Sequence, residues 1–130
     1  MVNGKGKSPH AKPKKSWEEI EADREIGERI RYVRVEIAGL DQRAFGARLG
    51  VTNPAVAQWE NGTGSCTRPN LDKIVEQFNI SRDWLHTGKG SPTLSRVVSE
   101  MHLLSRPRAE AVESYVRYLL EQEAGETKKQ

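Results

Sequence analysis

Residues 41–62, DQRAFGARLGVTNPAVAQWENG, decide how this chain folds. Their apolar side chains recur at helical spacing on both sides of Gly50, and glycine readily adopts the left-handed conformation of a tight turn. The stretch therefore predicts two short helices, 42–49 and 53–61, joined by that turn. The second helix carries no charged side chain before Glu60.

The ends of both helices carry suitable capping residues. Asp41 and Thr52 are good N-caps, and Pro54 is tolerated in the first turn of the second helix. This layout is that of a helix-turn-helix, which places its second helix in the major groove of DNA. The positions expected to point into a core are Phe45, Leu49, Val56 and Trp59.

The flanking sequence supplies three more helices for a small all-α bundle. A capping box at Ser16 and Glu19 predicts a helix that ends at Gly39. Asn70 is expected to cap a second helix, and Ser81 a short one that closes near Gly88. Their apolar positions are Ile26, Ile30, Val33 and Ile37, then Leu71, Ile74, Val75 and Phe78, then Trp84 and Leu85. We expect two of the three tryptophans, Trp59 and Trp84, to pack in the core.

The rest of the chain divides into segments of different character. We expect a flexible basic arm at 1–16, the helix-turn-helix domain at 17–90, a helical extension at 91–124 and a disordered tail at 125–130. The extension holds two apolar stripes, at 93–104 and 106–123, each too small for a core of its own. Dimerisation is the preferred role for these helices, and folding back onto the bundle is the alternative.

Composition excludes several function classes. The chain has 130 residues, 35% of them hydrophobic and 30% charged, with a net charge of +3. The one cysteine, Cys66, allows no internal disulfide and is expected to be inert, and no segment has the apolar length of a membrane span. The three histidines form no metal-ligand pattern. We therefore expect a cytoplasmic protein without membrane contact, enzymatic activity, metal or cofactor.

Residues 26–88 resemble the Xre family of phage-repressor-like regulators, which have the lambda-repressor-like fold. The segments that carry the resemblance are IGERIR, DQRAFGARLGVT, NPAVAQWENG and RPNLDKIVEQFNISRDWLHTG, in that order. The resemblance implies a five-helix helix-turn-helix bundle that binds a double-stranded DNA operator as a homodimer.

The resemblance also implies which residues contact DNA. The implied groove-facing residues of the second helix are Asn53, Pro54, Ala55 and Gln58. Gln42 is implied to grip a phosphate, and Asn61, with the backbone near Gly62 and Thr63, a second one. The residues agree with this, because a glutamine can read adenine and small apolar side chains can contact a thymine methyl. The alternatives are that Gln58 is an ordinary exposed polar residue and that Gln42 and Asn61 only cap helices.

Three positions depart from the family pattern. Asp41 stands where threonine is commoner, Gly46 replaces an alanine at a cost of about 1 kcal/mol in helix propensity, and Pro54 can give only apolar contact. Glu60 is expected to anchor the domain internally. The lysine-rich arm is expected either to track phosphates or to lie on the acidic run at 18–25.

The favoured function is a sequence-specific DNA-binding regulator, most simply a dimeric phage- or prophage-type repressor of a palindromic operator. An antirepressor protein is one route by which such a repressor could be released. The alternative from a different class is an antitoxin, which binds a toxin protein and also represses its own promoter.

Overall fold

The computed structural model describes residues 14–129, and in this part of the chain the regular secondary structure is all helical, without strands. The all-α class predicted from the sequence is confirmed. The expected flexibility of the arm concerns mostly residues 1–13, which lie outside the described part. The helices are α1 (Trp17–Tyr32), the π-helical turn η1 (Val33–Ala38), α2 (Gln42–Leu49), α3 (Asn53–Asn61), α4 (Arg68–Phe78), α5 (Arg82–Thr87), α6 (Leu94–Met101) and α7 (Arg106–Lys129).

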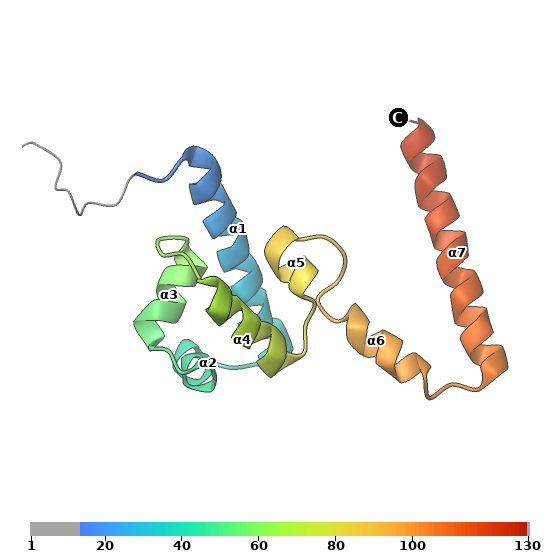
Figure 1. The fold of residues 1–130 in the computed structure, drawn as a ribbon, viewed down its shortest axis with the longest axis horizontal. Coiled ribbons are helices and arrows are strands. Elements are labelled where there is room, and N and C mark those ends of the chain that lie inside the picture. The colour runs from blue at the N-terminus through green and yellow to red at the C-terminus, as the bar shows by residue number, and fades with distance from the viewer. Residues whose placement is uncertain (1–13, 130) are drawn as a thin grey trace, which may run out of the picture.

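Helices α1 to α5 surround one core, with α3 packed against α1 and α2 (Figure 1). At its centre the rings of Phe45 and Phe78 stack with their centroids 5.0 Å apart. Trp59 is buried, and Trp84 is half-buried and meets Tyr32 edge-on, so these two tryptophans pack against the core as expected. The fully or nearly buried apolar residues are Ile30, Val33, Phe45, Leu49, Val56, Trp59, Leu71, Ile74, Phe78, Ile80 and Leu85.

Most of the predicted helix ends are confirmed. Ser16, Asp41, Thr52 and Ser81 each accept a backbone hydrogen bond as an N-cap. The prediction that Asn70 caps the fourth helix is wrong. That helix begins at Arg68, because Pro69 has a φ suited to a first turn and extends the helix back to the loop.

Two glycines let the helices approach closely. A Cβ added at Gly27 in α1 would lie 2.1 Å from the carbonyl oxygen of Trp59, so no other residue fits between α1 and α3 without displacing one of them. A Cβ at Gly46 would lie 2.7 Å from the carbonyl oxygen of Val51, in the turn between α2 and α3. The glycine that departs from the family pattern therefore allows the tight turn that positions α3.

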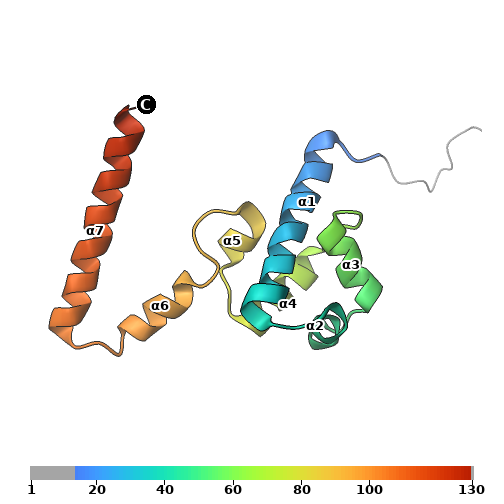
Figure 2. The ribbon, with the colours of Figure 1, turned by 180° about the vertical axis from the view of Figure 1, so that it is seen from behind.

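Helices α6 and α7 extend away from the bundle (Figures 1 and 2). Arg96 ties α6 to the end of α4 by donating hydrogen bonds to the carbonyls of Phe78 and Asn79. Helix α6 is shorter than the predicted 93–104. Helix α7 is longer than the predicted 106–123 and continues to Lys129, so the expected disordered tail at 125–130 is wrong as far as Lys129.

Candidate nucleic-acid interface

Helix α3 presents its first turns to solvent and buries its other face. Asn53, Pro54 and Gln58 are exposed and Ala55 is half-buried. Val56 and Trp59 lie on the opposite face, in the core. The structure therefore places the four predicted groove-facing residues on one accessible surface of α3, while the opposite face of this helix packs in the core.

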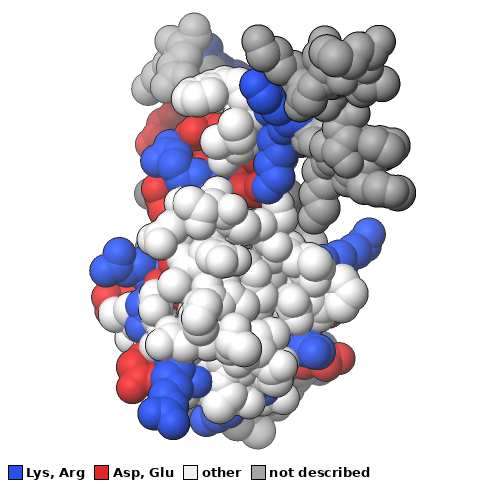
Figure 3. All heavy atoms as spheres, turned by 90° about the vertical axis from the view of Figure 1, so that its left-hand side faces the viewer, with Lys and Arg blue, Asp and Glu red and all other residues white. Residues whose placement is uncertain are grey.

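The surface around α3 is uncharged at its centre. Figure 3 views the side of the molecule on which α2 and α3 lie, and a broad area without Lys, Arg, Asp or Glu occupies its middle, with both basic and acidic side chains around its margin. An uncharged centre suits contact with base edges, and the basic side chains among those of the margin are the ones suited to contact with phosphates.

The Gln58 side chain lies against the loop that follows α3. The backbone carbonyl of Gln58 accepts hydrogen bonds from the amides of Thr63 (3.0 Å) and Gly64 (3.2 Å). These hydrogen bonds fold the loop back over Gln58. A Cβ added at Gly64 would be 3.1 Å from the Cβ of Gln58 and 3.3 Å from its Oε1. The glycine leaves space for this glutamine, and the loop limits the directions that its side chain can take.

At the end of α3, the backbone amides are already engaged in hydrogen bonds, whereas the side chains are free to meet solvent. The amide of Gly62 donates to the carbonyl of Trp59 at 3.2 Å, and the amide of Thr63 is engaged with Gln58. A phosphate contact by these two amides would have to share donors that already serve the helix end. The side chains of Asn61 and Thr63 are exposed.

A buried ion pair joins η1 to the end of α3. Arg34 donates to both carboxylate oxygens of Glu60, through Nε at 2.6 Å and through Nη2 at 2.9 Å. The Glu60 side chain is only 4% exposed and that of Arg34 is 12% exposed. The hydrogen bond with Glu60 raises the pKa of Arg34 above its ordinary value. Glu60 thus anchors the domain internally, as the sequence predicted.

This ion pair also reaches the predicted phosphate-contacting residue of α2. The Gln42 amide donates from Nε2 to Oε1 of Glu60 at 3.3 Å, and Arg34 donates from Nη1 to the carbonyl of Leu40 at 3.0 Å. Gln42 is half-buried and is held at the start of α2, between the ion pair and solvent. Its side chain is therefore oriented by the same network that fixes the end of α3.

Sequence reasoning missed Arg34 and Arg43. Arg34 pairs with a residue 26 positions away, which helical spacing within one element cannot reveal. Arg43 is exposed beside Gln42 in the first turn of α2. A basic residue adjoining a predicted phosphate contact was the available signal for Arg43.

The root of the N-terminal arm is fastened to the loop after α3. Lys15 donates from Nζ to Asp23 of α1 and to Ser65 of the loop, both at 2.6 Å, and the Ser65 hydroxyl contacts the same Asp23 oxygen at 2.8 Å. Partial burial acts to raise the pKa of Asp23, but hydrogen bonds from Lys15 and Ser65 outweigh it, so the pKa is lowered. The last part of the arm thus contacts the acidic run, one of its two expected positions.

Other kinds of site find little support in the described residues. Burial raises the pKa of the Cys66 thiol to about 12, which keeps it protonated and unreactive. Between residues 14 and 129 the structure brings together no group of three or more His, Cys, Asp or Glu that could hold a metal ion. Within the same range, no helix combines the length and apolar character needed to cross a bilayer.

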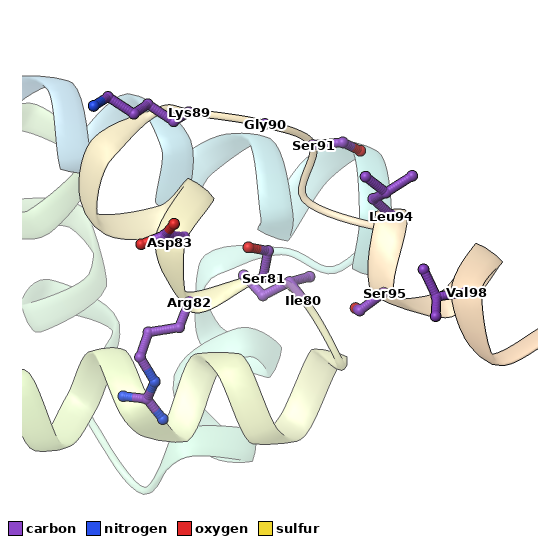
Figure 4. Close-up of a pocket in the computed structure, with 10 residues that line it drawn as sticks. All are labelled: Ile80, Ser81, Arg82, Asp83, Lys89, Gly90, Ser91, Leu94, Ser95 and Val98. Atoms are coloured by element: carbon purple, nitrogen blue, oxygen red, sulfur yellow. The ribbon is translucent and has the colours of Figure 1, made fainter. Parts of the chain in front are cut away.

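A hollow of about 500 Å³ lies between α5 and α6. Ile80, Leu94 and Val98 give it apolar walls, while Arg82 points toward α4, where it pairs with Asp72, and Lys89 points outward (Figure 4). The side chains of Arg82 and Lys89 thus point away from the hollow.

Comparison with known proteins identifies the central part of the chain. Residues 30–85, from within α1 into α5, match the helix-turn-helix family. An uncharacterized HTH-type transcriptional regulator of Haemophilus influenzae is 37% identical over 62 residues, which are 48% of this chain. These residues span only 25% of that relative's length. Residues 30–85 are therefore similar to the helix-turn-helix family, and about half of the chain is similar to a quarter of a transcriptional regulator.

A solved structure is similar to about half of this chain. It is the P22 c2 repressor protein in complex with the synthetic operator 9T in the presence of Tl⁺, with 34% sequence identity to this chain and a TM-score of 0.44. The match covers 49% of this chain and 96% of the repressor chain.

Proposed function

We propose that the helix-turn-helix domain of residues 30–85 makes this protein a sequence-specific DNA-binding transcriptional regulator, acting as a dimeric repressor on a palindromic operator. The observation that carries the proposal is the surface of α3. Its exposed residues are uncharged and it is backed by a buried core, as an element that enters the major groove requires. Repression follows if the protein occupies a promoter and excludes polymerase.

Base reading is assigned to the first turns of α3. Gln58 and Asn53 carry amide groups that can donate to and accept from an adenine edge, and Pro54 and Ala55 can pack on a thymine methyl. Gln58 is the principal reader, because the loop at Gly64 restricts its side chain before DNA is bound. A restricted side chain loses less conformational entropy on binding.

Phosphate contacts are assigned to the two ends of the motif. Gln42, oriented through Glu60, serves one side of the groove, and the side chains of Asn61 and Thr63 near the α3–α4 loop serve the other. The amides of Gly62 and Thr63 contribute only by sharing donors with α3. Arg43 adds a positive charge next to Gln42. These contacts fix the register of α3 in the groove without reading sequence.

Dimerisation is assigned to α6 and α7. One recognition helix reads only a few base pairs, and a two-fold dimer can place two of them about 34 Å apart, one turn of DNA. Apolar side chains on both helices are exposed. Arg96 holds α6 to the bundle, so a dimer formed through this extension would also set the distance between the two α3 helices.

Replacing Gln58 by alanine tests the proposed reading of bases. We expect Gln58→Ala to weaken binding to the cognate site by about 1–3 kcal/mol and to relax specificity at one base pair. Binding to random DNA should change little, because phosphates supply that affinity. The matched control is Gln77→Ala on α4, an exposed glutamine outside the motif that should leave both affinities unchanged.

Two outcomes would contradict the proposal. An equal loss of affinity on cognate and random DNA would show that Gln58 does not read bases. A protein that binds no DNA selectively, but co-purifies with a small toxin, would favour the antitoxin alternative.

A further inference from the structure

The extension leaves an apolar surface without a partner in the described part of this chain. The exposed fractions of Leu94, Val116 and Leu120 are 55%, 47% and 59%. Helix α7 has 24 residues and stands apart from α1 to α5 (Figures 1 and 2). A helix that exposes such a stripe gains most of its stability from packing against another element.

A hollow of about 520 Å³ lies along this surface, between the start of α6 and the second half of α7. Its walls are apolar at Leu94, Val116, Leu119 and Leu120, and two carboxylates, Glu123 and Glu126, line one end. Whatever fills this hollow needs an apolar stripe and a positive charge beyond the end of that stripe.

The first half of α7 itself has these two features. Helical spacing puts Arg108 on the same face as Val112 and Val116, four residues before the apolar stretch begins. The other two arginines of α7, Arg106 and Arg117, pair with Glu110 and Glu113, and these four residues share the opposite face. Arg108 is therefore the arginine of α7 that accompanies the apolar stripe.

We propose, building on the dimer of the proposed function, that the α7 helices of two copies pack antiparallel, so that Arg108 of each copy meets Glu123 and Glu126 of the other. The apolar stretch from Val112 to Leu120 is centred on Val116. Pairing about that centre brings position 108 opposite position 124, between the two carboxylates. Each copy then fills the hollow of the other with the same residues, as a two-fold interface requires.

Charge decides the orientation of the two helices. A parallel pairing would bring Arg108 of one copy next to Arg108 of the other, and Glu123 next to Glu123. Like charges would then face each other at both ends of the interface. An antiparallel pairing matches opposite charges at both ends. Complementary charges at the margin of an apolar interface set register and exclude wrong arrangements.

Charge reversal in the full-length chain tests the pairing. We expect Arg108→Glu to raise the dimer dissociation constant about tenfold, because two attractive contacts become repulsive. Glu123→Lys combined with Glu126→Lys should do the same, and the triple variant should return the dissociation constant to within about twofold of the unmodified chain. Arg106→Glu, on the opposite face, is the matched control and should leave it unchanged. Sedimentation equilibrium measures all of them.

Disulfide trapping tests the orientation independently. In a Cys66→Ser background, Ala109→Cys and Glu123→Cys lie opposite each other across an antiparallel pair. Each variant alone should stay unlinked on mild oxidation, and an equimolar mixture should form a mixed disulfide. Linkage of each variant to itself would mean a parallel pair and would overturn the proposal.

The outcomes separate this proposal from the function on which it depends. A full-length chain that is monomeric at all concentrations would overturn both the dimer and the pairing. A dimer indifferent to Arg108→Glu would overturn the pairing alone. A dimer that follows the charge reversals but binds no DNA selectively would overturn the proposed function and support the pairing.

Discussion

The bundle of α1 to α5 and the extension of α6 and α7 are both made of amphipathic helices, yet they treat their apolar residues differently. In the bundle, Ile30, Val33, Phe45 and Ile74 are fully buried. Among residues 91–128 of the extension, whose burial the structure describes, none is buried, and the exposed large apolar residues are Leu94, Val97, Val98, Leu103, Leu104, Tyr115, Val116, Tyr118, Leu119 and Leu120. The bundle buries its apolar side chains within its own core, whereas the extension exposes apolar side chains that would be buried only against a partner.

The same contrast holds for ion pairs. The Arg34–Glu60 pair is nearly excluded from solvent and ties two helices together. The Arg106–Glu110 pair lies on the open face of α7 and joins neighbouring turns of one helix. Buried pairs matter when one member is removed, because the remaining charge is left without a partner, and exposed pairs contribute little.

The largest expected effect comes from breaking the buried pair. We expect Arg34→Met to lower the free energy of unfolding by about 3 kcal/mol, since Glu60 would remain buried without its partner. The loss of the network would also free Gln42. Urea unfolding measures the change, and Arg106→Met in the extension is the control, expected to change stability by less than about 0.5 kcal/mol. If Arg34→Met and Arg106→Met lowered the free energy of unfolding equally, the contrast between the buried and the exposed ion pair would be contradicted.

A smaller effect is expected from adding one methyl group in each region. At Gly27 the new Cβ would collide with the carbonyl of Trp59, so Gly27→Ala should destabilise the bundle by about 2 kcal/mol despite its better helix propensity. At Gly125 in α7 the added Cβ meets nothing within 4 Å, so Gly125→Ala should not destabilise the chain. Thermal unfolding of both variants compares them; a Gly27→Ala protein as stable as the unmodified one would mean that α1 and α3 are farther apart than described.

The smallest effect is expected at the loop beside the reading helix. Gly64→Ala would press on Gln58, so it should reduce affinity for the cognate DNA site by less than about tenfold, without changing the affinity for random DNA. Gly125→Ala is again the control. Fluorescence anisotropy with both DNAs measures the difference. Loss of affinity on both DNAs alike would show that Gly64 supports the fold and not the reading of bases.

Much of the bundle was predictable because local signals determine it. N-cap residues and the glycine at position 50 define α2 and α3, and apolar spacing locates the inward positions of each helix. Asn70 misled the prediction because the helix already begins at Arg68, with Pro69 in its first turn. Ile80 was missed because it lies between helices, where periodicity gives no information.

The features missed by sequence depend on contacts between distant segments. The Arg34–Glu60–Gln42 network, the tie from Arg96 to α4 and the fastening of Lys15 to Ser65 each join segments far apart in the chain. The identity of the reading residues was predicted from position in the motif, and their contact with bases stays a prediction. The structure adds how they are held.

Selection of bound sequences from random double-stranded DNA by the full-length protein tests the central claim most directly. If α3 reads bases in each half of a two-fold dimer, the selected sequences should converge on a palindrome with half-sites about one helical turn apart. Gln58→Ala should then lose preference at one base pair in each half-site. Selected sequences that show no enrichment, at a salt concentration where the protein still binds, would contradict sequence-specific recognition by this helix.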